Sequence, residues 1–492
     1  MGATTADKQE LARGSCGAVP LPRLPSPGLV AAGLPSSTHV ITWHKFSEQG
    51  PAWLLAALLC LVFFTGGSSW ISEPQLMVLR PAALVLAALG VLTFRLEHLT
   101  GYWVVWALFL GALGLTVLHL VPMPFEWWSK LPGRGIIVEI DEVVGLGKIW
   151  RPLSMSPDST LHALLSLSVP FAVLLLAVQL TDRQHQYMLG LVLGLAGLSG
   201  AVGLLQASGS QIEFYPLSTP VSGLFANRNH QGALLAMIIP MAAAGSLLTF
   251  GGKVNLMVRT FLALGMAIIA VPLIIVTGSR SALVVLALGL VFAGLIWSWR
   301  KGGEAAGWKL RLATPLAIAA TTGGLVWLTV FAARDVAIDR LQATGEDLRW
   351  PVWKSIVDML PAYMPWGTGI GSYAEAYQIL EPDELLRPTK SNHAHNELLE
   401  VVFTAGVPGL VIFLLAGAAL VYGLRRAYSR KSSGSEAAVL SRLGTAMIVL
   451  LAVASATDYP VRTPIMSAIL VLAAVWASLG GSKASPKPLD QG

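Results

Sequence analysis

The sequence predicts an all-α integral membrane protein with about twelve transmembrane helices and a large outer loop that contains short helices. Three observations support this fold class. Of the 492 residues, 54% are hydrophobic and 12% are charged, about half the charged fraction of a typical soluble protein. The apolar residues form runs of roughly 17 to 25, the length that crosses about 30 Å of hydrocarbon. Lys and Arg gather in alternate connections between these runs, as expected of a multi-pass protein.

The apolar runs divide the chain into five parts. The predicted spans lie near residues 52–69, 77–94, 102–121, 159–180, 186–208, 230–250, 258–277, 281–298, 312–333, 397–424, 443–457 and 463–480. The parts are an N-terminal tail at 1–50, helices one to nine at 51–333, a large outer loop at 334–396, helices ten to twelve at 397–480, and a C-terminal tail at 481–492. Residues 1–50 are rich in Pro, Gly and Ser without helical periodicity, so we expect a flexible cytoplasmic tail.

The positions of Lys and Arg orient the spans. Placing both ends of the chain inside keeps the dense basic cluster at 425–442 on the cytoplasmic side, where positive loops are retained. The net charge of +6 is then a topology signal, and we expect no nucleic-acid partner. Cys16 and Cys60 fall in the tail and in the first span, so neither a disulfide framework nor a thiolate metal site is predicted.

The outer loop at 334–396 has enough apolar and aromatic content to fold. Residues 352–360 have helical spacing, and Pro361 and Pro365 are predicted to end that helix. Three glycines at 367–371 then provide a permissive turn. We expect an amphipathic helix over the mouth of a site at the membrane boundary.

Polar side chains gather where this loop enters the next span. His393 and His395 are two residues apart, and three interpretations are open for them: metal ligands, structural caps, or a general base that accepts a hydroxyl proton. Asn396 and Glu400 share one helical face, as do His393 and Glu397, so the carboxylates could orient the imidazoles or pair with Arg. Glu400 lies a turn inside the apolar run, where an ionisable group indicates function.

Two arginines lie at the outer ends of other spans. Arg228 follows Asn227 and precedes Asn229 and His230, and Arg280 sits in a short polar turn between two apolar runs. Arg228 could cap a helix, and Arg280 could reach lipid headgroups. The alternative is a clamp for an anion, because a guanidinium is a planar, always charged donor suited to phosphate oxygens.

A third outer arginine, Arg462, lacks such polar company. It lies four residues after Asp458, near the start of the last predicted span. We therefore expect an interfacial position and an ion pair with Asp458.

One motif carries a family resemblance. His395-Asn396, nine residues, then Gly406-Val407-Pro408-Gly409 resembles the signature His-[Asn/Ser/Gln]-x9-Gly-x-x-Gly of the bacterial O-antigen ligase superfamily. That superfamily also includes Wzy-type O-antigen and exopolysaccharide polymerases. The predicted spans, the loop before the motif and the outer arginines fit its pattern over about residues 50–480.

The resemblance implies a membrane glycosyltransferase of the GT-C type in the bacterial inner membrane, with its active site facing the periplasm. The donor would be a glycan linked to undecaprenyl pyrophosphate, with no nucleotide sugar, metal or other cofactor. Arg228 and Arg280 would bind the pyrophosphate and His395 would deprotonate the acceptor, with inversion at the anomeric carbon. The motif glycines Gly406 and Gly409 would be structural. Residues expected to line the substrate site are Asn227, Asn229, His230, His393, Asn396, Glu397 and Glu400.

The acceptor stays open in this interpretation. It is either lipid A-core, for a ligase, or a second lipid-linked repeat unit, for a polymerase, with membrane lipids and polysaccharide-export proteins as further partners. Outside the enzymes, a transporter for lipid-linked glycans is the alternative. A transporter would be expected to place charges near the membrane midplane and to show an internal repeat. The predicted spans are apolar there and no repeat is visible.

Overall fold

The computed structural model describes residues 36–216, 218–252, 255–298, 349–386, 390–429 and 435–479. These residues are mostly helical, with 73% in helices and almost no strand, which confirms the all-α prediction. Their one sheet is a two-stranded pair, in which β1 (Pro122–Met123) runs antiparallel to β2 (Arg151–Pro152). Residues 1–45 and 46–492 form separate units, and every contact of the candidate site lies in the second.

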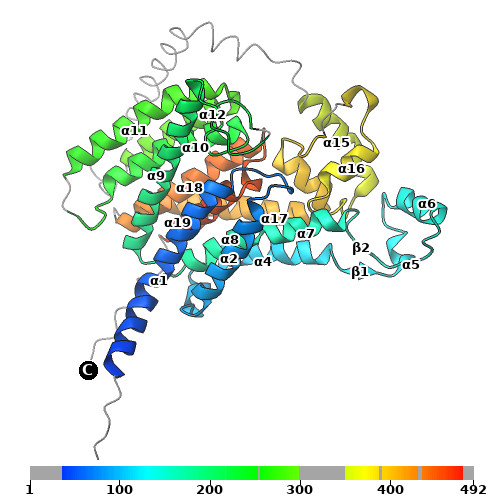
Figure 1. The fold of residues 1–492 in the computed structure, drawn as a ribbon, viewed down its shortest axis with the longest axis horizontal. Helices are drawn as coiled ribbons and strands as arrows, with labels where there is room; N and C mark the ends of the chain where they lie inside the picture. The colour runs from blue at the N-terminus through cyan, green and yellow to red at the C-terminus, as the bar shows by residue number, and fades with distance from the viewer. Residues whose placement is uncertain are drawn as a thin grey trace, which may run out of the picture. The chain divides into compact units, whose positions relative to one another are not determined.

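Figure 1 labels most of the helices along the chain. Their bounds are α1 (Ser36–Thr65), α2 (Leu76–Val91), α3 (Glu97–Thr100), α4 (Trp103–Leu118), α5 (Phe125–Trp128), α6 (Gly135–Val143), α7 (Pro157–Ser166), α8 (Ser168–Ala177), α9 (Asp182–Ala207), α10 (Arg228–Leu247), α11 (Leu256–Thr277), α12 (Arg280–Ser298), α15 (Arg349–Tyr363), α16 (Tyr373–Ile379), η1 (Asp383–Leu385), α17 (Glu397–Ala427), α18 (Glu436–Ser455), η2 (Pro460–Arg462) and α19 (Pro464–Leu479).

Eight helical segments among the described residues are long and apolar enough to cross a membrane. The chain is therefore a multi-pass membrane protein. Shorter apolar helices, α2, α4 and α19, coincide with three more of the predicted spans. The span predicted at 312–333 lies outside the described residues, so the count of twelve stays a prediction. The first candidate span, Glu48–Thr65, lies close to the predicted 52–69, whereas helix α1 itself begins at Ser36, inside the predicted tail.

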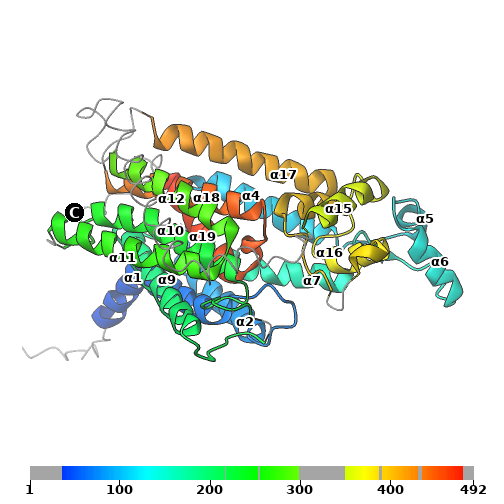
Figure 2. The ribbon, with the colours of Figure 1, turned by 90° about the horizontal axis from the view of Figure 1, so that it is seen from above.

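Helix α10 is the most enclosed of the eight spans, with 89% of its apolar window buried. It packs against α9, α11, α12 and α18, which surround it in Figure 2. Small residues permit this approach: a Cβ on Gly232 would lie 2.5 Å from the Cβ of Ala282 in α12. The close packing fixes the first turn of α10, where Arg228, Asn229 and His230 lie.

Several helix ends meet on the face that the charge pattern assigns to the outside. The carbonyl of Gly66, just after α1, accepts a hydrogen bond from the amide of Ile465 in α19 at 3.1 Å. The Gly67 carbonyl accepts from the amide of Ala226, just before α10, at 3.1 Å. These backbone contacts hold the loop after α1 between the starts of α10 and α19.

A separate polar contact ties helix ends together on the opposite face. Glu436, at the start of α18, accepts hydrogen bonds from Gln186 Nε2 at 2.7 Å and from Thr249 Oγ1 at 2.6 Å. Gln186 belongs to the first turns of α9, and Thr249 follows α10. This carboxylate therefore serves packing, at the end of the helices away from the polar motif.

The two outer loops are joined by a buried arginine. Arg134 is fully buried and donates to the carbonyls of Leu153 at 2.7 Å and Gly367 at 3.0 Å. The predicted outer helix is present as α15, which continues through Pro361 and ends at Tyr363, before Pro365. Pro361 has no N–H, so α15 lacks one backbone hydrogen bond just before it ends.

Candidate functional site

His395 is paired with a buried carboxylate. Its Nδ1 lies 3.2 Å from Oδ1 of Asp458, which is 2% exposed and follows α18. The other carboxylate oxygen accepts a hydrogen bond from Asn229 Nδ2 at 2.6 Å, and His230 Nε2 lies 3.6 Å from Oδ1. Burial by itself would raise the pKa of Asp458, but the contacts with His230 and His395 hold that pKa well below its usual range. Asp458 is therefore a charged anchor for the imidazoles.

The second ring nitrogen of His395, Nε2, is accessible to a substrate. The side chain is 34% exposed, and its Nε2 makes no hydrogen bond with any described residue. A carboxylate at Nδ1 favours the tautomer that carries its proton there, which leaves the Nε2 lone pair unprotonated. His395 can therefore accept a proton from a group that approaches Nε2.

His393, in contrast, uses both ring nitrogens. Its Nδ1 lies 3.0 Å from Glu400 Oε1, and its Nε2 lies 3.2 Å from the hydroxyl of Ser69 in the loop after α1. Burial lowers the pKa of His393 even though Glu400 opposes the shift. His393 is therefore a neutral connector, and of the two motif histidines His395 is the one with an unbonded nitrogen.

Arg462 is the arginine that pairs with the carboxylates of α17. Its Nε lies 3.1 Å from Glu397 Oε2, and its Nη1 lies 3.1 Å from Glu400 Oε1. The expected pair with Asp458 is wrong for the described structure, because Pro460 starts a short 3-10 turn and the two side chains reach different elements. Burial would lower the pKa of Arg462, but the two carboxylates outweigh it and raise that pKa. The guanidinium is therefore a permanent countercharge to the start of α17.

Two of the predicted substrate residues act as helix caps. The Asn396 side chain accepts a hydrogen bond from the amide of Leu399 at 3.1 Å, at the start of α17. The Asn227 side chain accepts from the amide of Asn229 at 2.8 Å, at the start of α10. Both caps satisfy amides that would otherwise lack partners. They fix the helix starts on which the imidazoles and Arg228 are placed.

Arg228 and Arg280 are the first residues of α10 and α12. The guanidinium of Arg228 makes no hydrogen bond or ion pair within the described part of the chain, while its amide donates to Thr219 Oγ1 at 2.7 Å. Arg280 is exposed. The two helix starts are neighbours, since a Cβ on Gly232 would lie 3.4 Å from that of Ser279. Helix starts favour anions, and the two arginines add full positive charges there.

A further arginine was missed by sequence analysis. Arg349, at the start of α15, places Nη2 3.9 Å from Oδ2 of Asp458. Ser69 and Tyr459 were missed as well, and Asp458 was predicted only as a partner of Arg462 and not of His395. Each comes from a connection that carries no motif of its own, and each reaches the site through a contact distant in sequence. The only feature of the sequence that could have indicated these residues is a polar or aromatic side chain at the outer end of a span.

The Gly-x-x-Gly motif shapes the helix that follows His395. Gly406 has φ +59° and ψ −149°, which breaks the regular geometry of α17. A Cβ there would lie 2.1 Å from the carbonyl oxygen of Pro365, which accepts a hydrogen bond from the amide of Val407 at 2.8 Å. The Thr404 carbonyl lacks a helical partner because residue 408 is a proline without an N–H, and it accepts a hydrogen bond from the amide of Gly369 at 2.8 Å. Gly406 therefore lets the outer-loop turn dock against the backbone of α17.

Gly409, in the turn after Gly406, leaves room for the irregular backbone of α17 at that point. A Cβ on Gly409 would lie 2.4 Å from the Cβ of Ala405, closer than two methyl groups can approach. The pair of glycines therefore fixes the position of the outer loop relative to the first turns of α17, where Glu397 and Glu400 lie.

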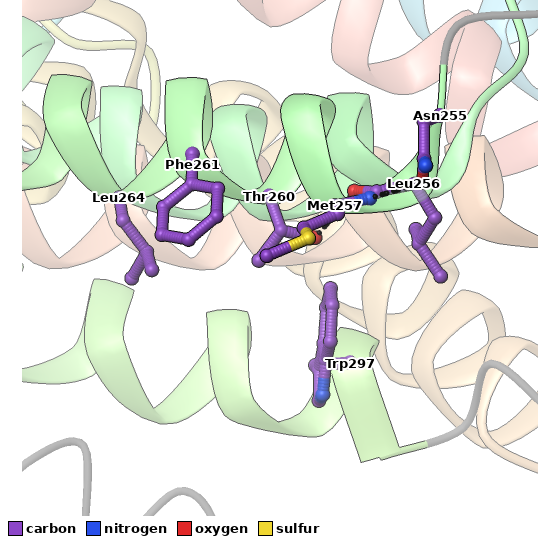
Figure 3. Close-up of a pocket in the computed structure, with 7 residues that line it drawn as sticks. All are labelled: Asn255, Leu256, Met257, Thr260, Phe261, Leu264 and Trp297. Carbon is purple, nitrogen blue, oxygen red and sulfur yellow. Dashed lines mark hydrogen bonds between the residues drawn. The ribbon is translucent and has the colours of Figure 1, made fainter.

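A groove between α11 and α12 lies apart from these polar groups. It has a volume of about 480 Å³ and lies at the start of α11 and the end of α12 (Figure 3). Its lining is Asn255, Leu256, Met257, Thr260, Phe261, Leu264 and Trp297. None of these side chains is an acid or a base that could activate a nucleophile, and the Thr260 hydroxyl donates to the carbonyl of Leu256 in its own helix at 2.8 Å, so the groove is not a candidate catalytic centre. Within the described ranges, no group of three or more His, Cys, Asp or Glu is arranged to hold a metal ion.

Residues 264–414 match a protein-family model whose description is O-antigen ligase. The matched range contains Arg280, His395, Gly406 and Gly409, whereas Asp458 lies beyond it. No curated protein sequence matches the chain at a significant level.

Proposed function

We propose that this chain, whose residues 264–414 match the O-antigen ligase family model, is a member of that superfamily and a GT-C-type glycosyltransferase of the bacterial inner membrane. It transfers or polymerises a glycan from an undecaprenyl-pyrophosphate-linked donor onto a sugar hydroxyl on the periplasmic face. The observation that carries the proposal is the pairing of the partly exposed His395 with the buried carboxylate of Asp458.

His395 acts as the general base in this mechanism. The acceptor hydroxyl approaches Nε2, loses its proton to the imidazole, and its oxygen attacks the anomeric carbon of the donor sugar. The resulting imidazolium is stabilised by Asp458, which lies 3.2 Å from Nδ1. A positioned base of this kind contributes about 10²- to 10⁴-fold to a reaction rate.

The leaving group is the lipid pyrophosphate. As the bond to the anomeric carbon breaks, its electron pair moves to the phosphate oxygen, where negative charge develops. Arg228 and Arg280, at two neighbouring helix starts, offset this charge. Arg349, within 4 Å of Asp458, brings a third guanidinium to the same face. A single displacement inverts the anomeric carbon and needs neither a covalent glycosyl-enzyme nor a metal or other cofactor.

The remaining predicted residues have supporting roles in the proposal. Asn229 and His230 hold Asp458 from α10, while Glu397 and Glu400 hold Arg462 and His393. Asn227, Asn396, Gly406 and Gly409 shape the helices that carry the site. Substrate contacts by these groups remain part of the proposal.

The acceptor decides between two forms of the reaction. Transfer to lipid A-core makes the protein a ligase, and transfer to a second lipid-linked repeat makes it a polymerase. Both use the same donor, base and arginines. The family description names the ligase, and we place ligation first and Wzy-type polymerisation second.

One experiment tests the activity and separates the two forms. Purified protein in detergent receives the lipid-linked oligosaccharide together with either lipid A-core or further lipid-linked repeats. A single shifted band with lipid A-core indicates a ligase, and a ladder of products indicates a polymerase. Full activity of both Arg280→Ala and His395→Ala would refute the proposed site. A chelator should leave the rate unchanged, and loss of activity would instead support a metal at the histidines.

A further inference from the structure

Tyr459 contacts every imidazole of the candidate site. Its ring centroid lies 4.2 Å from that of His393, 4.8 Å from that of His395 and 5.1 Å from that of His230. The side chain is 7% exposed, so the ring fills the space between the three histidines. The ring planes are tilted or perpendicular to it, which are favourable geometries for aromatic pairs.

The backbone of Tyr459 supports the same histidine by a second route. Its amide donates a hydrogen bond at 2.9 Å to Oδ1 of Asp458, the oxygen that also contacts Nδ1 of His395. One residue therefore orients the carboxylate through its main chain and packs against the imidazole through its ring.

His395 needs such support because its own backbone gives it little. It has φ +50°, a left-handed conformation that residues other than glycine adopt uncommonly, and it precedes Asn396, the N-cap of α17. A displacement of about 1 Å in a reacting group can reduce a rate about 100-fold, so the ring must be held by its contacts.

We propose that Tyr459 is a positioning residue for glycosyl transfer: its ring holds the His395 imidazole so that Nε2 faces the acceptor hydroxyl, and separates it from His393. This inference rests on the proposed function of His395 as the base.

The ring, and not the hydroxyl, carries this role. Burial raises the pKa of the Tyr459 phenol, although hydrogen bonds with Asn392 and Asn227 partly oppose the shift. The phenol is therefore neutral at ordinary pH, and its oxygen is engaged by neighbouring amides. Removing the hydroxyl should matter much less than removing the ring.

The kinetic test compares Tyr459→Phe with Tyr459→Leu. The Leu variant should lose about 10- to 100-fold in kcat with KM changed less than about twofold, and the Phe variant should stay within about threefold of the wild type. Tyr377→Leu is the matched control, because Tyr377 is fully buried but packs in the outer loop against Tyr373. It should lower thermal stability without the selective loss of kcat. A Phe variant as slow as the Leu variant, or a Leu variant with normal kcat, would overturn the proposal.

A spectroscopic test does not depend on turnover. Histidine labelled with ¹⁵N, assigned with a His395→Gln variant, reports the tautomer and environment of the His395 ring in detergent. Tyr459→Leu should change these signals, while Tyr459→Phe and Tyr377→Leu should preserve them. If the wild type proves inactive with lipid-linked donors but the signals change as expected, the proposed function fails and the positioning contact stands. Unchanged His395 signals in the Leu variant would refute the positioning role even in an active enzyme.

Discussion

Replacing Asp458 by Asn probes the charge that supports the base. The side-chain amide of the introduced asparagine has the same shape as the carboxylate, and its oxygen can still accept a hydrogen bond from Nδ1 of His395. It cannot stabilise the imidazolium that forms when His395 takes the acceptor proton. A hydrogen bond to a charged group contributes about 1.5–3 kcal/mol, and about 1.4 kcal/mol is tenfold in rate. We therefore expect kcat to fall about 10- to 150-fold, with KM changed less than about twofold.

The control for this variant is Glu436→Gln at the other end of the helices. Both carboxylates accept a side-chain amide, Asp458 from Asn229 at 2.6 Å and Glu436 from Gln186 at 2.7 Å, so both substitutions bring two amide groups together. Each should cost some stability, but Glu436→Gln should keep the wild-type kcat. Initial rates with the lipid-linked donor, measured at equal amounts of folded protein, make the comparison. Equal losses of kcat in the two variants would show that Asp458 has no role beyond folding.

Three further predictions concern stability, measured by tryptophan fluorescence during thermal unfolding in detergent. Gly406→Ala should lower the free energy of unfolding by at least about 2 kcal/mol, because φ is +59° and a Cβ would lie 2.1 Å from a carbonyl oxygen. Gly417→Ala, in open space on the same helix, should be neutral or stabilising, and equal destabilisation of the two would contradict the motif's role. Arg462→Met should cost about 3–5 kcal/mol because it removes the ion-pair partner of buried Glu397 and leaves buried Glu400 with only His393 and the Ala394 amide. Lys354→Met, which breaks an exposed pair, should cost less than about 1 kcal/mol. The free energy of unfolding of the wild type should fall as the pH drops below about 6.5. In that range His393 binds a proton in the unfolded chain, whereas in the folded protein its pKa is lowered and it stays neutral. His393→Gln should flatten that dependence, and an unchanged slope would show that another group is responsible.

The sequence predicted the local elements of this protein well. Apolar runs marked helices that the structure contains, because each span must satisfy its own backbone hydrogen bonds in the membrane. The polar residues at 391–400 were recognised because charged and imidazole groups are costly at the start of an apolar helix. The Gly406 and Gly409 spacing also had a local cause, the break in α17.

The partners of those residues could not be read from the sequence. Asp458 is 63 positions from His395, and Ser69 is 324 positions from His393, so both contacts depend on how whole helices pack. The predicted pair of Arg462 with Asp458 failed for a related reason. Asp458 and Arg462 are four residues apart, a spacing that places two side chains on one face of a helix. A 3-10 turn that begins at Pro460 separates these two side chains instead.

The most direct test of the central claim is the stoichiometry of the reaction. Purified protein would be incubated with the lipid-linked donor and its acceptor, and released undecaprenyl pyrophosphate would be counted against new glycosidic bonds. We predict one pyrophosphate lipid released for each bond formed with inverted anomeric configuration, and at least about a 100-fold slower reaction with His395→Gln. Bond formation at the wild-type rate in that variant, or retention of the anomeric configuration, would contradict a single displacement assisted by His395.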